Sequence, residues 1–115
     1  MSCTTNNKPY FKIGDSFDVP IQMIDTLTGE AVEITVGMTF TSNIVNLTGE
    51  VIASPTITPY PNQITDKGFL LLTVLPTTTI NWEVGKVKMD IKLVVDGSVR
   101  HSQDFSFNII EAITP

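Results

Sequence analysis

One stretch of the chain, residues 81–110, specifies its own structure. Apolar residues alternate with mostly charged ones from Lys86 to Val95, which is the pattern of a strand with one apolar face and one charged face. A second alternation runs from Ser98 to Ile109, after Asp96-Gly97. An Asp-Gly pair between two alternating runs indicates a β-hairpin. The stretch therefore predicts two long antiparallel strands.

The parity of the two runs predicts the length of the hairpin loop. A two-residue loop would pair Val95 with Ser98, which would place the apolar residues of the two strands on opposite faces. A three-residue loop brings them onto one face. We therefore expect the loop Val95-Asp96-Gly97, with a glycine bulge and Gly97 in the left-handed region. Asp96-Gly97-Ser98 is the other three-residue loop that fits.

Shorter strands are predicted elsewhere in the chain. Phe17–Ile24 alternates, but Pro20 cannot donate to a sheet ladder, so an edge strand or a bulge is expected there. A strand that begins at Met38 changes its apolar parity after Ile44, which indicates a bulge near Asn43 or a change of sheet. Residues 69–75 show no alternation, which is typical of a strand covered on both faces.

The fold class follows from these short strands and frequent turn signals. No segment has a convincing helical period. We expect an all-β protein, an antiparallel, immunoglobulin-like β-sandwich with about seven to nine short strands, and a small β-barrel is the alternative. The length of 115 residues favours one domain over residues 10–115, preceded by a flexible arm over residues 1–9. Leu-Thr-Gly-Glu at 27–30 and again at 47–50 predicts two similar tight turns.

Charge and hydropathy exclude several classes of partner. The net charge is −5, and the basic stripe of Lys86, Lys88 and Lys92 is interrupted by Asp90, so nucleic-acid binding is not expected. No apolar run approaches the roughly 20 residues of a membrane helix. The first residues do not resemble a signal peptide, so we expect neither export nor membrane insertion.

The sequence does not predict a catalytic or metal site. Cys3 lies in the polar start of the chain, where we expect it to be exposed, and a single cysteine forms no intrachain disulfide. His101 is the sole histidine, and the three-residue loop would place it with Gln103 on the apolar face, in a packing role. Metal-binding motifs are absent, although a calcium ion between loops stays an alternative. We expect a protein that is not an enzyme and has no cofactor.

Four residues are candidates for an interface. The aromatic residues Trp82 and Tyr60 have the chemistry to stack on sugars or to anchor a partner, although core packing is the ordinary role of such residues. Ile24 and Val94 are apolar residues on otherwise polar strand faces. If Ile24 and Val94 are neighbours in space, they would form a patch of the kind that marks an interface.

The residues around Trp82 carry a resemblance to a known group of proteins. Thr77–Leu93, Asp96-Gly97, Phe105–Ile109 and Ile113-Thr114-Pro115 together resemble a pattern in small phage-encoded tail proteins, as do Gly14–Phe17 and the turn at 25–30. The resemblance implies an immunoglobulin-like structural protein of a phage or prophage, in the tail, baseplate or neck.

Such a protein would bind other virion or tail proteins and copies of itself as a homo-oligomer. It would be located in the virion or in the cytoplasm of the bacterial host. The alternative function is a β-sandwich module that binds carbohydrate or a cell-surface ligand.

Overall fold

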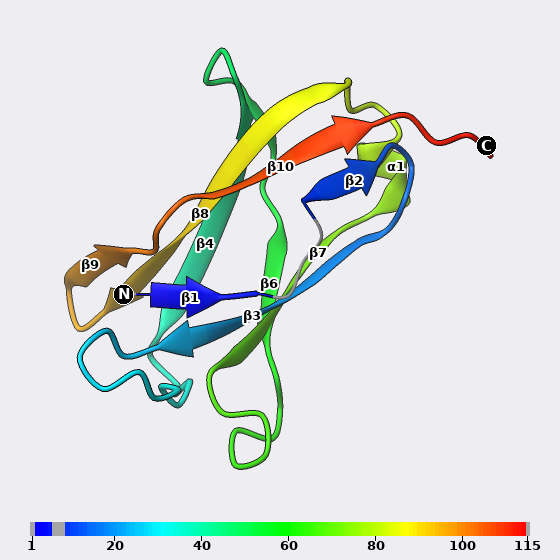
Figure 1. The fold of residues 1–115 in the computed structure, drawn as a ribbon. Coiled ribbons are helices and arrows are strands. Elements are labelled where there is room, and N and C mark those ends of the chain that lie inside the picture. The colour runs from blue at the N-terminus through cyan, green and yellow to red at the C-terminus, as the bar shows by residue number, and fades with distance from the viewer. Residues whose placement is uncertain (1, 6–8, 115) are drawn as a thin grey trace.

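A computed structural model describes residues 2–5 and 9–114 as two stacked β-sheets (Figure 1). The elements in chain order are β1 Ser2–Thr4, β2 Tyr10–Lys12, β3 Phe17–Ile24, β4 Thr39–Asn46, β5 Val51–Ala53, β6 Thr56–Pro59, β7 Phe69–Val74, α1 Pro76–Thr79, β8 Gly85–Val95, β9 Ser98–His101 and β10 Phe105–Ile110. The described residues contain no helix with the length and hydropathy needed to span a bilayer.

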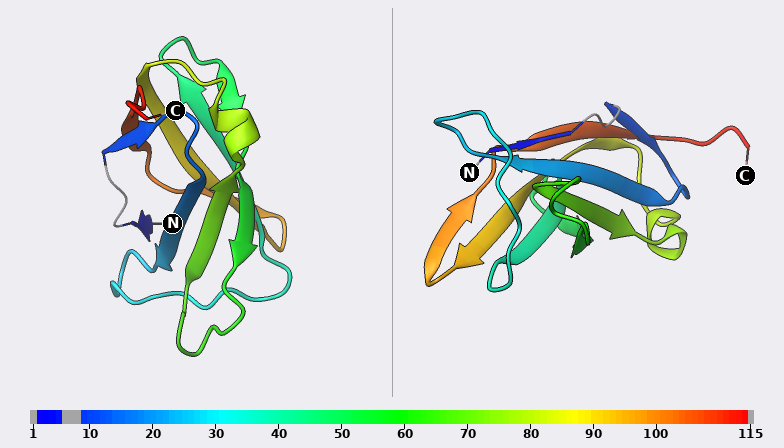
Figure 2. Two further views of the ribbon diagram at one scale, coloured as in Figure 1. Left: turned by 90° about the vertical axis from the view of Figure 1, so that its right-hand side faces the viewer. Right: turned by 90° about the horizontal axis from the view of Figure 1, so that it is seen from below.

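The strands form a β-sandwich, as the sequence predicts. Sheet A has the order β1-β3-β7-β6, and sheet B has the order β2-β10-β8-β4-β5, with β9 also paired to β8. All pairs are antiparallel except β2 and β10. Figure 2 shows the two layers, with sheet A facing the viewer in the left view. The described strands do not close into a barrel.

The described residues form ten strands rather than seven to nine, because the second strand of the hairpin is divided into β9 and β10 and because Ser2–Thr4 of the predicted arm forms β1. β9 and β10 pair with successive parts of β8. β5 and β6 are separated by Ser54-Pro55, where the chain crosses from sheet B to sheet A. The irregularity expected near Asn43 lies slightly later, between Ile44 and Val45 in the pairing of β4 with β5.

The predicted three-residue hairpin loop is wrong. Val95 pairs with Ser98, so the loop is the two residues Asp96-Gly97. Both have positive φ, 49° and 79°, as a two-residue type I′ turn requires.

A bulge further along the hairpin changes which residues face the core, so that the alternation in β10 is shifted by one residue relative to β9. Lys92 pairs with His101 and Met89 pairs with Phe105, so two residues of β8 oppose the three residues 102–104. The Oγ of Ser102 accepts a hydrogen bond from the Ile91 amide at 2.9 Å, in place of a backbone carbonyl. The bulge returns the apolar residues of β10 to the inner face.

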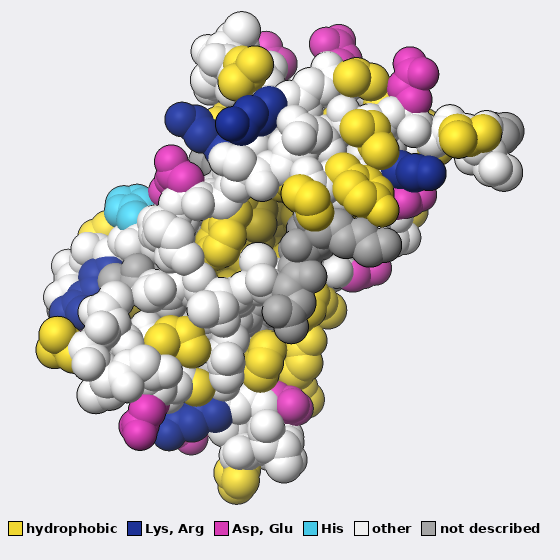
Figure 3. All heavy atoms as spheres, in the orientation of Figure 1, with side chains coloured by type: hydrophobic (Ala, Val, Ile, Leu, Met, Phe, Trp, Pro, Cys, Tyr) yellow, Lys and Arg dark blue, Asp and Glu magenta, His cyan; other side chains and the backbone are white. Residues whose placement is uncertain are grey.

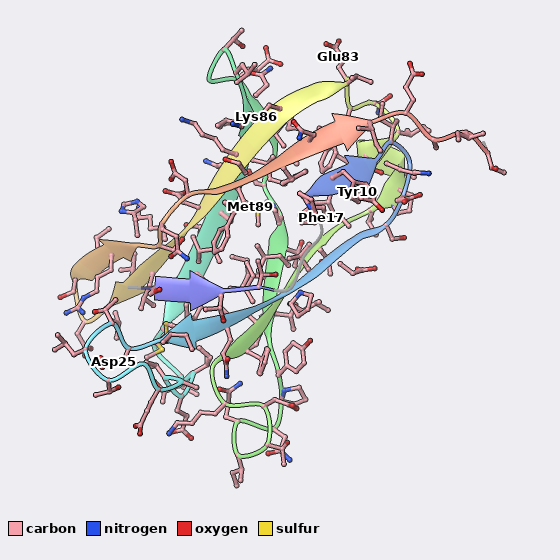
Figure 4. The ribbon with its side chains drawn as sticks, in the orientation of Figure 1. Tyr10, Phe17, Asp25, Glu83, Lys86 and Met89 are labelled. Carbon is pink, nitrogen blue, oxygen red and sulfur yellow. The ribbon has the colours of Figure 1, made fainter. Side chains whose placement is uncertain are left out.

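The core lies between the sheets and comes from alternate residues of the strands. Phe17 and Met89, both labelled in Figure 4, are 0% and 3% exposed and belong to opposite sheets. Phe11, Phe17, Phe107 and Trp82 form an aromatic cluster, with the rings of Phe11 and Trp82 5.2 Å apart. Each fully buried side chain of this size stabilises the fold by about 1.5–3 kcal/mol. The aromatic cluster therefore joins the two sheets.

Part of the predicted N-terminal arm belongs to the sandwich. β1 pairs with β3 at the edge of sheet A, and Cys3 is 1% exposed, so the expectation of an exposed thiol is wrong. The side chain of Gln103, in the bulge, accepts from the Cys3 amide at 3.1 Å and donates to the Cys3 carbonyl. The side-chain amide of Gln103 thus makes the two hydrogen bonds that the backbone of a neighbouring strand would make with β1. Residues 1 and 6–8 of the predicted arm lie outside the described residues.

Pro20 lies in the part of β3 that has a paired strand on one side only, within the described residues. β1 pairs with Gln22–Ile24 only, so within the described residues Pro20 has a ladder partner on one side, Leu71 of β7. A proline at this position removes no ladder hydrogen bond toward β1, which agrees with the predicted edge position.

Candidate interaction surfaces

The described residues do not assemble a nucleophile, a base and an acid. His101 lies on the exposed strand β9, beside Lys92, because β9 precedes the bulge. The prediction that His101 shares the apolar face is therefore wrong, and its imidazole is on the surface (cyan in Figure 3). Burial raises the pKa of the Cys3 thiol to about 11, which disfavours the nucleophilic thiolate. No group of three or more His, Cys, Asp or Glu side chains in this part of the chain is placed to hold a metal ion.

The four predicted interface residues occupy three different environments. Trp82 is 6% exposed and packs in the aromatic cluster. Tyr60 follows β6, and its ring lies 5.5 Å from that of Phe69. Ile24 is on the outward side of sheet A, whereas Val94 is on the outward side of sheet B. The structure brings Tyr60 and Ile24 to the same sheet, and it separates both from Val94 and Trp82.

The outward side of sheet A is almost uncharged and carries an apolar patch, which is bordered by threonines and Gln22. Leu71, which is half-buried, is paired with Pro20 on one side and Thr58 on the other, and Phe69 is paired with Gln22. The inward residues Leu70 and Leu72 alternate with these and are fully buried. The four strands of sheet A contain one charged residue, Asp18. We call this surface the apolar face; it comprises Pro20, Ile24, Tyr60, Phe69 and Leu71.

The outward side of sheet B is basic. Lys86, Lys88 and Lys92 are exposed along β8, with Asp90 between them. Their neighbours on β4 and β10 are mostly polar, for example Thr41 and Ser106, and Val45 beside Lys88 is the apolar exception. Figure 3 shows the dark blue lysine side chains over the upper part of β8, and Figure 4 labels Lys86 there. We call this surface the lysine face. It has the composition of a solvated strand surface.

A groove of about 660 Å³ lies between the β4–β5 turn and the segment from α1 to β8. Both segments are in the upper half of Figure 1. Its lining is mixed: aliphatic side chains alternate with amide, hydroxyl and charged groups, among them Glu83, which is labelled in Figure 4. The lining residues include Leu47, Val51, Ile52, Thr77, Asn81, Trp82, Val84, Lys86 and Ile109.

The single-turn helix α1 positions Trp82 at this groove. Pro76 begins the helix, where its missing N–H costs no hydrogen bond. Thr79 is fully buried, and its Oγ donates to the Asp15 carbonyl at 2.7 Å, which fixes α1 on the preceding segment. The Trp82 amide then donates to the Thr79 carbonyl at 3.0 Å. The indole therefore enters the core from the rim of the groove.

Sequence reasoning found one of these surfaces only indirectly and missed the other. The apolar run of residues 69–75, in which Thr73 is the polar exception, signals the apolar face, because its outward residues Phe69 and Leu71 are as apolar as its inward ones. The groove has no local signal. It is formed by segments about 30 residues apart, which meet through the pairing of β4 with β8.

Comparisons with known proteins agree on the fold. No protein-family model matches the chain, and no curated protein matches it. Among solved structures, CopC from Methylosinus trichosporium OB3b superposes with a TM-score of 0.55 at 11% identity, over 96% of this chain and 91% of CopC. A DUF4426 family protein from Pseudomonas aeruginosa PAO1 superposes with a TM-score of 0.52 at 16% identity, over 86% of this chain and 68% of that protein.

The resemblance to phage tail proteins is overturned by these neighbours, which are bacterial β-sandwich proteins. The residues that carried it, such as Asp96-Gly97 and the alternation of β8, are features that β-sandwiches share whatever their role. At 11% and 16% identity the likeness establishes the fold alone.

Proposed function

We propose that the chain is a non-enzymatic module that acts through protein–protein contacts, and that its apolar face binds a second copy. The observation that carries this proposal is the outward side of β7. Phe69 and Leu71 face away from the core, on a sheet whose strands hold a single charged residue. Contiguous apolar surface of this kind marks contact sites in soluble proteins.

Charge favours a second copy as the partner. Two apolar faces bring together only two Asp18 carboxylates, which lie toward one end of β3. Two lysine faces would instead oppose three lysines with three lysines. A symmetric dimer places the same patch on both subunits, so a face with little charge is self-compatible.

The size of the apolar face sets the expected strength. Six residue pairs join β3 to β7, which corresponds to about 20 Å of strand, and three strands span about 15 Å. Such an area, about 300 Å² on each copy, is smaller than that of stable specific interfaces. We therefore expect a weak dimer whose population depends on concentration.

The carbohydrate alternative has less support from the geometry. Trp82 is buried, so it presents no ring face to a sugar. Tyr60 packs on Phe69 and is only partly exposed. Neither of the two aromatic residues predicted as sugar-stacking platforms therefore offers a freely exposed ring.

A pair of matched variants tests the dimer. Leu71 and Val94 are both partly buried aliphatic residues on outward strand positions, of sheet A and sheet B respectively. Leu71→Lys is expected to weaken self-association by about tenfold or more, because it buries a charge at the interface, whereas Val94→Lys leaves it unchanged.

Sedimentation velocity over a concentration series measures the association, and circular dichroism checks that both variants fold. A wild-type chain that stays monomeric at every concentration would sink the proposal. So would an equal effect of both variants.

A further inference from the structure

The outward side of sheet A changes in polarity along its strands. Pairing of β3 and β6 with β7 places the outward residues in three rows across the sheet. The first row is Asp18, Thr73 and Thr56; the second is Pro20, Leu71 and Thr58; the third is Gln22, Phe69 and Tyr60. The middle residue of each row belongs to β7. One end of this surface is therefore charged and rich in hydroxyl groups, and the other end is aromatic.

A second copy can cover this surface in two aligned ways. Aligned sheets that pack face to face keep their strand directions within about 30° of each other. A twofold axis along β7 sets the two β7 strands in the same direction, so each row lies opposite the same row of the partner. A twofold axis across the strands reverses the partner, so the first row lies opposite the partner's third row. Leu71 lies opposite the partner's Leu71 in both arrangements, because it is in the middle row of the middle strand.

The residues of β7 favour the arrangement in which like rows are opposed. Phe69 then packs against the partner's Phe69, and such aromatic pairs contribute beyond the area that they bury. With unlike rows opposed, each phenyl ring would cover the hydroxyl of a Thr73, which would lose water without gaining a hydrogen-bond partner. The polar rows keep their hydration when they oppose each other. Like rows therefore combine the apolar contact with the smaller desolvation cost.

We propose, as an inference that rests on the proposed dimer, that the two copies pack about a twofold axis along β7, with Phe69 against the partner's Phe69 and Thr73 against the partner's Thr73. In this arrangement β3 of one copy lies over β6 of the other, so the two Asp18 carboxylates are on opposite edges of the interface. Two strand spacings, about 10 Å, separate them laterally, and the sheets are about 10 Å apart. This separation exceeds the Debye length of about 8 Å at physiological ionic strength, so their repulsion is screened.

Variants of opposite charge at Thr73 test the arrangement. Thr73→Lys and Thr73→Glu should each weaken self-association by about tenfold, because like charges oppose each other across the axis. An equimolar mixture should associate at least as tightly as the wild type, because each lysine then meets a glutamate. Sedimentation velocity measures the association, and circular dichroism checks that both variants fold. With unlike rows opposed, residue 73 would face Phe69, and the mixture would associate no better than either variant alone.

Leu71→Lys and Leu71→Glu are the matched control pair. Residue 71 faces its counterpart in both arrangements, so mixing these two variants should improve association over either variant alone whichever arrangement forms. Thr73→Lys mixed with Phe69→Glu is the reverse test. These two charges meet only when unlike rows are opposed, so this mixture should associate more weakly than the wild type.

Positions at the edges of the surface give a second readout, which does not depend on the folding of the Thr73 variants. Asp18 and Thr56 are exposed. Asp18 faces the partner's Thr56 when like rows are opposed, and the partner's Gln22 when unlike rows are opposed. Asp18→Lys mixed with Thr56→Glu should therefore associate more tightly than Asp18→Lys mixed with Gln22→Glu.

The outcomes distinguish the arrangement from the dimer itself. Recovery in the Thr73 mixture, with the stronger association in the mixture that contains Thr56→Glu, supports the arrangement. Recovery in the Leu71 mixture but not in the Thr73 mixture, together with stronger association of the mixture that contains Gln22→Glu, would overturn the arrangement and leave the dimer standing. Recovery in neither the Leu71 nor the Thr73 mixture would overturn both.

Discussion

The outward sides of the two sheets differ although their inward sides are alike. β3 and β7 of sheet A, like β8 of sheet B, alternate fully buried apolar residues with outward ones. On β8 the outward residues are mostly lysines, but on β7 they are Phe69, Leu71 and Thr73. Only the inward residues form the core, so the types of the outward residues depend on what each face contacts. The lysine face has the composition of a solvated surface, and we propose that the apolar face contacts protein.

The largest expected effect comes from breaking sheet A at one end. Gly68 has φ of 82°, and a Cβ there would lie 2.8 Å from the Met23 carbonyl oxygen. Gly68→Ala should therefore reduce the free energy of unfolding by at least about 2 kcal/mol. Gly49, in the turn of sheet B, has φ of 85° but nothing within 4 Å, so Gly49→Ala should cost about 1 kcal/mol. Urea unfolding measures both, and equal losses would contradict the steric argument.

The next effect concerns the place where the two sheets are joined by Gln103. Gln103→Ala removes both hydrogen bonds to the Cys3 backbone and should cost about 1–2 kcal/mol. It should also speed the reaction of Cys3 with maleimide, because β1 is released. Gln22→Ala, which removes one exposed hydrogen bond to Lys67, is the control and should leave the thiol protected. An unchanged labelling rate in Gln103→Ala would show that β1 is held by other contacts.

A smaller effect is expected on the lysine face. Lys88→Gln should change the free energy of unfolding by less than about 0.5 kcal/mol, since an exposed lysine on a strand is solvated in both states. Self-association should also be unaffected. A clear drop in dimer stability in the same sedimentation experiment would mean that this face, too, is an interface.

The smallest effect near neutral pH is the titration of Cys3. Burial raises the pKa of its thiol from 9.0 to about 11 in the folded chain, so the unfolded chain loses this proton first as the pH rises. The contribution of Cys3 to stability is therefore intact below pH 9 and falls between pH 9 and pH 11. Thermal unfolding of the wild type and of Cys3→Ala across this range should show a pH dependence that the variant lacks.

The sequence predicted the strands of the two sheets better than the turns, the bulge and the helix that connect them. Alternation identified β3, β8 and the hairpin, because burial acts on every second residue. The predicted loop length was wrong because the apolar residues of the two strands are brought to one face by the bulge at Ser102–Asp104, not by the loop. In the bulge, side chains of Ser102 and Gln103 make hydrogen bonds in place of backbone groups. Helix α1 has only four residues, too few to show a period. No local pattern reveals such features.

The residues of the candidate surfaces were also predicted only in part from the sequence. Tyr60 and Ile24 were predicted as interface residues, and they lie on the apolar face, whose role as an interface is a proposal. Trp82 was identified by residue type alone, and only its surroundings show a buried ring with an unpaired N–H. Val94 shares its sheet with the lysines. The grouping of these residues depends on long-range pairing, which is not encoded in any short window.

The clamp between Cys3 and Gln103 has a consequence for the order of events during synthesis. The two residues are 100 positions apart, and β2 likewise pairs with β10 at the other end of the chain. Neither contact can form until Gln103, for β1, and Asn108, for β2, have left the ribosome. The first strands must therefore wait, unpaired on one side, for the last ones, and contacts so distant in sequence slow folding. The nascent chain is accordingly most exposed to aggregation while β10 is still inside the ribosome.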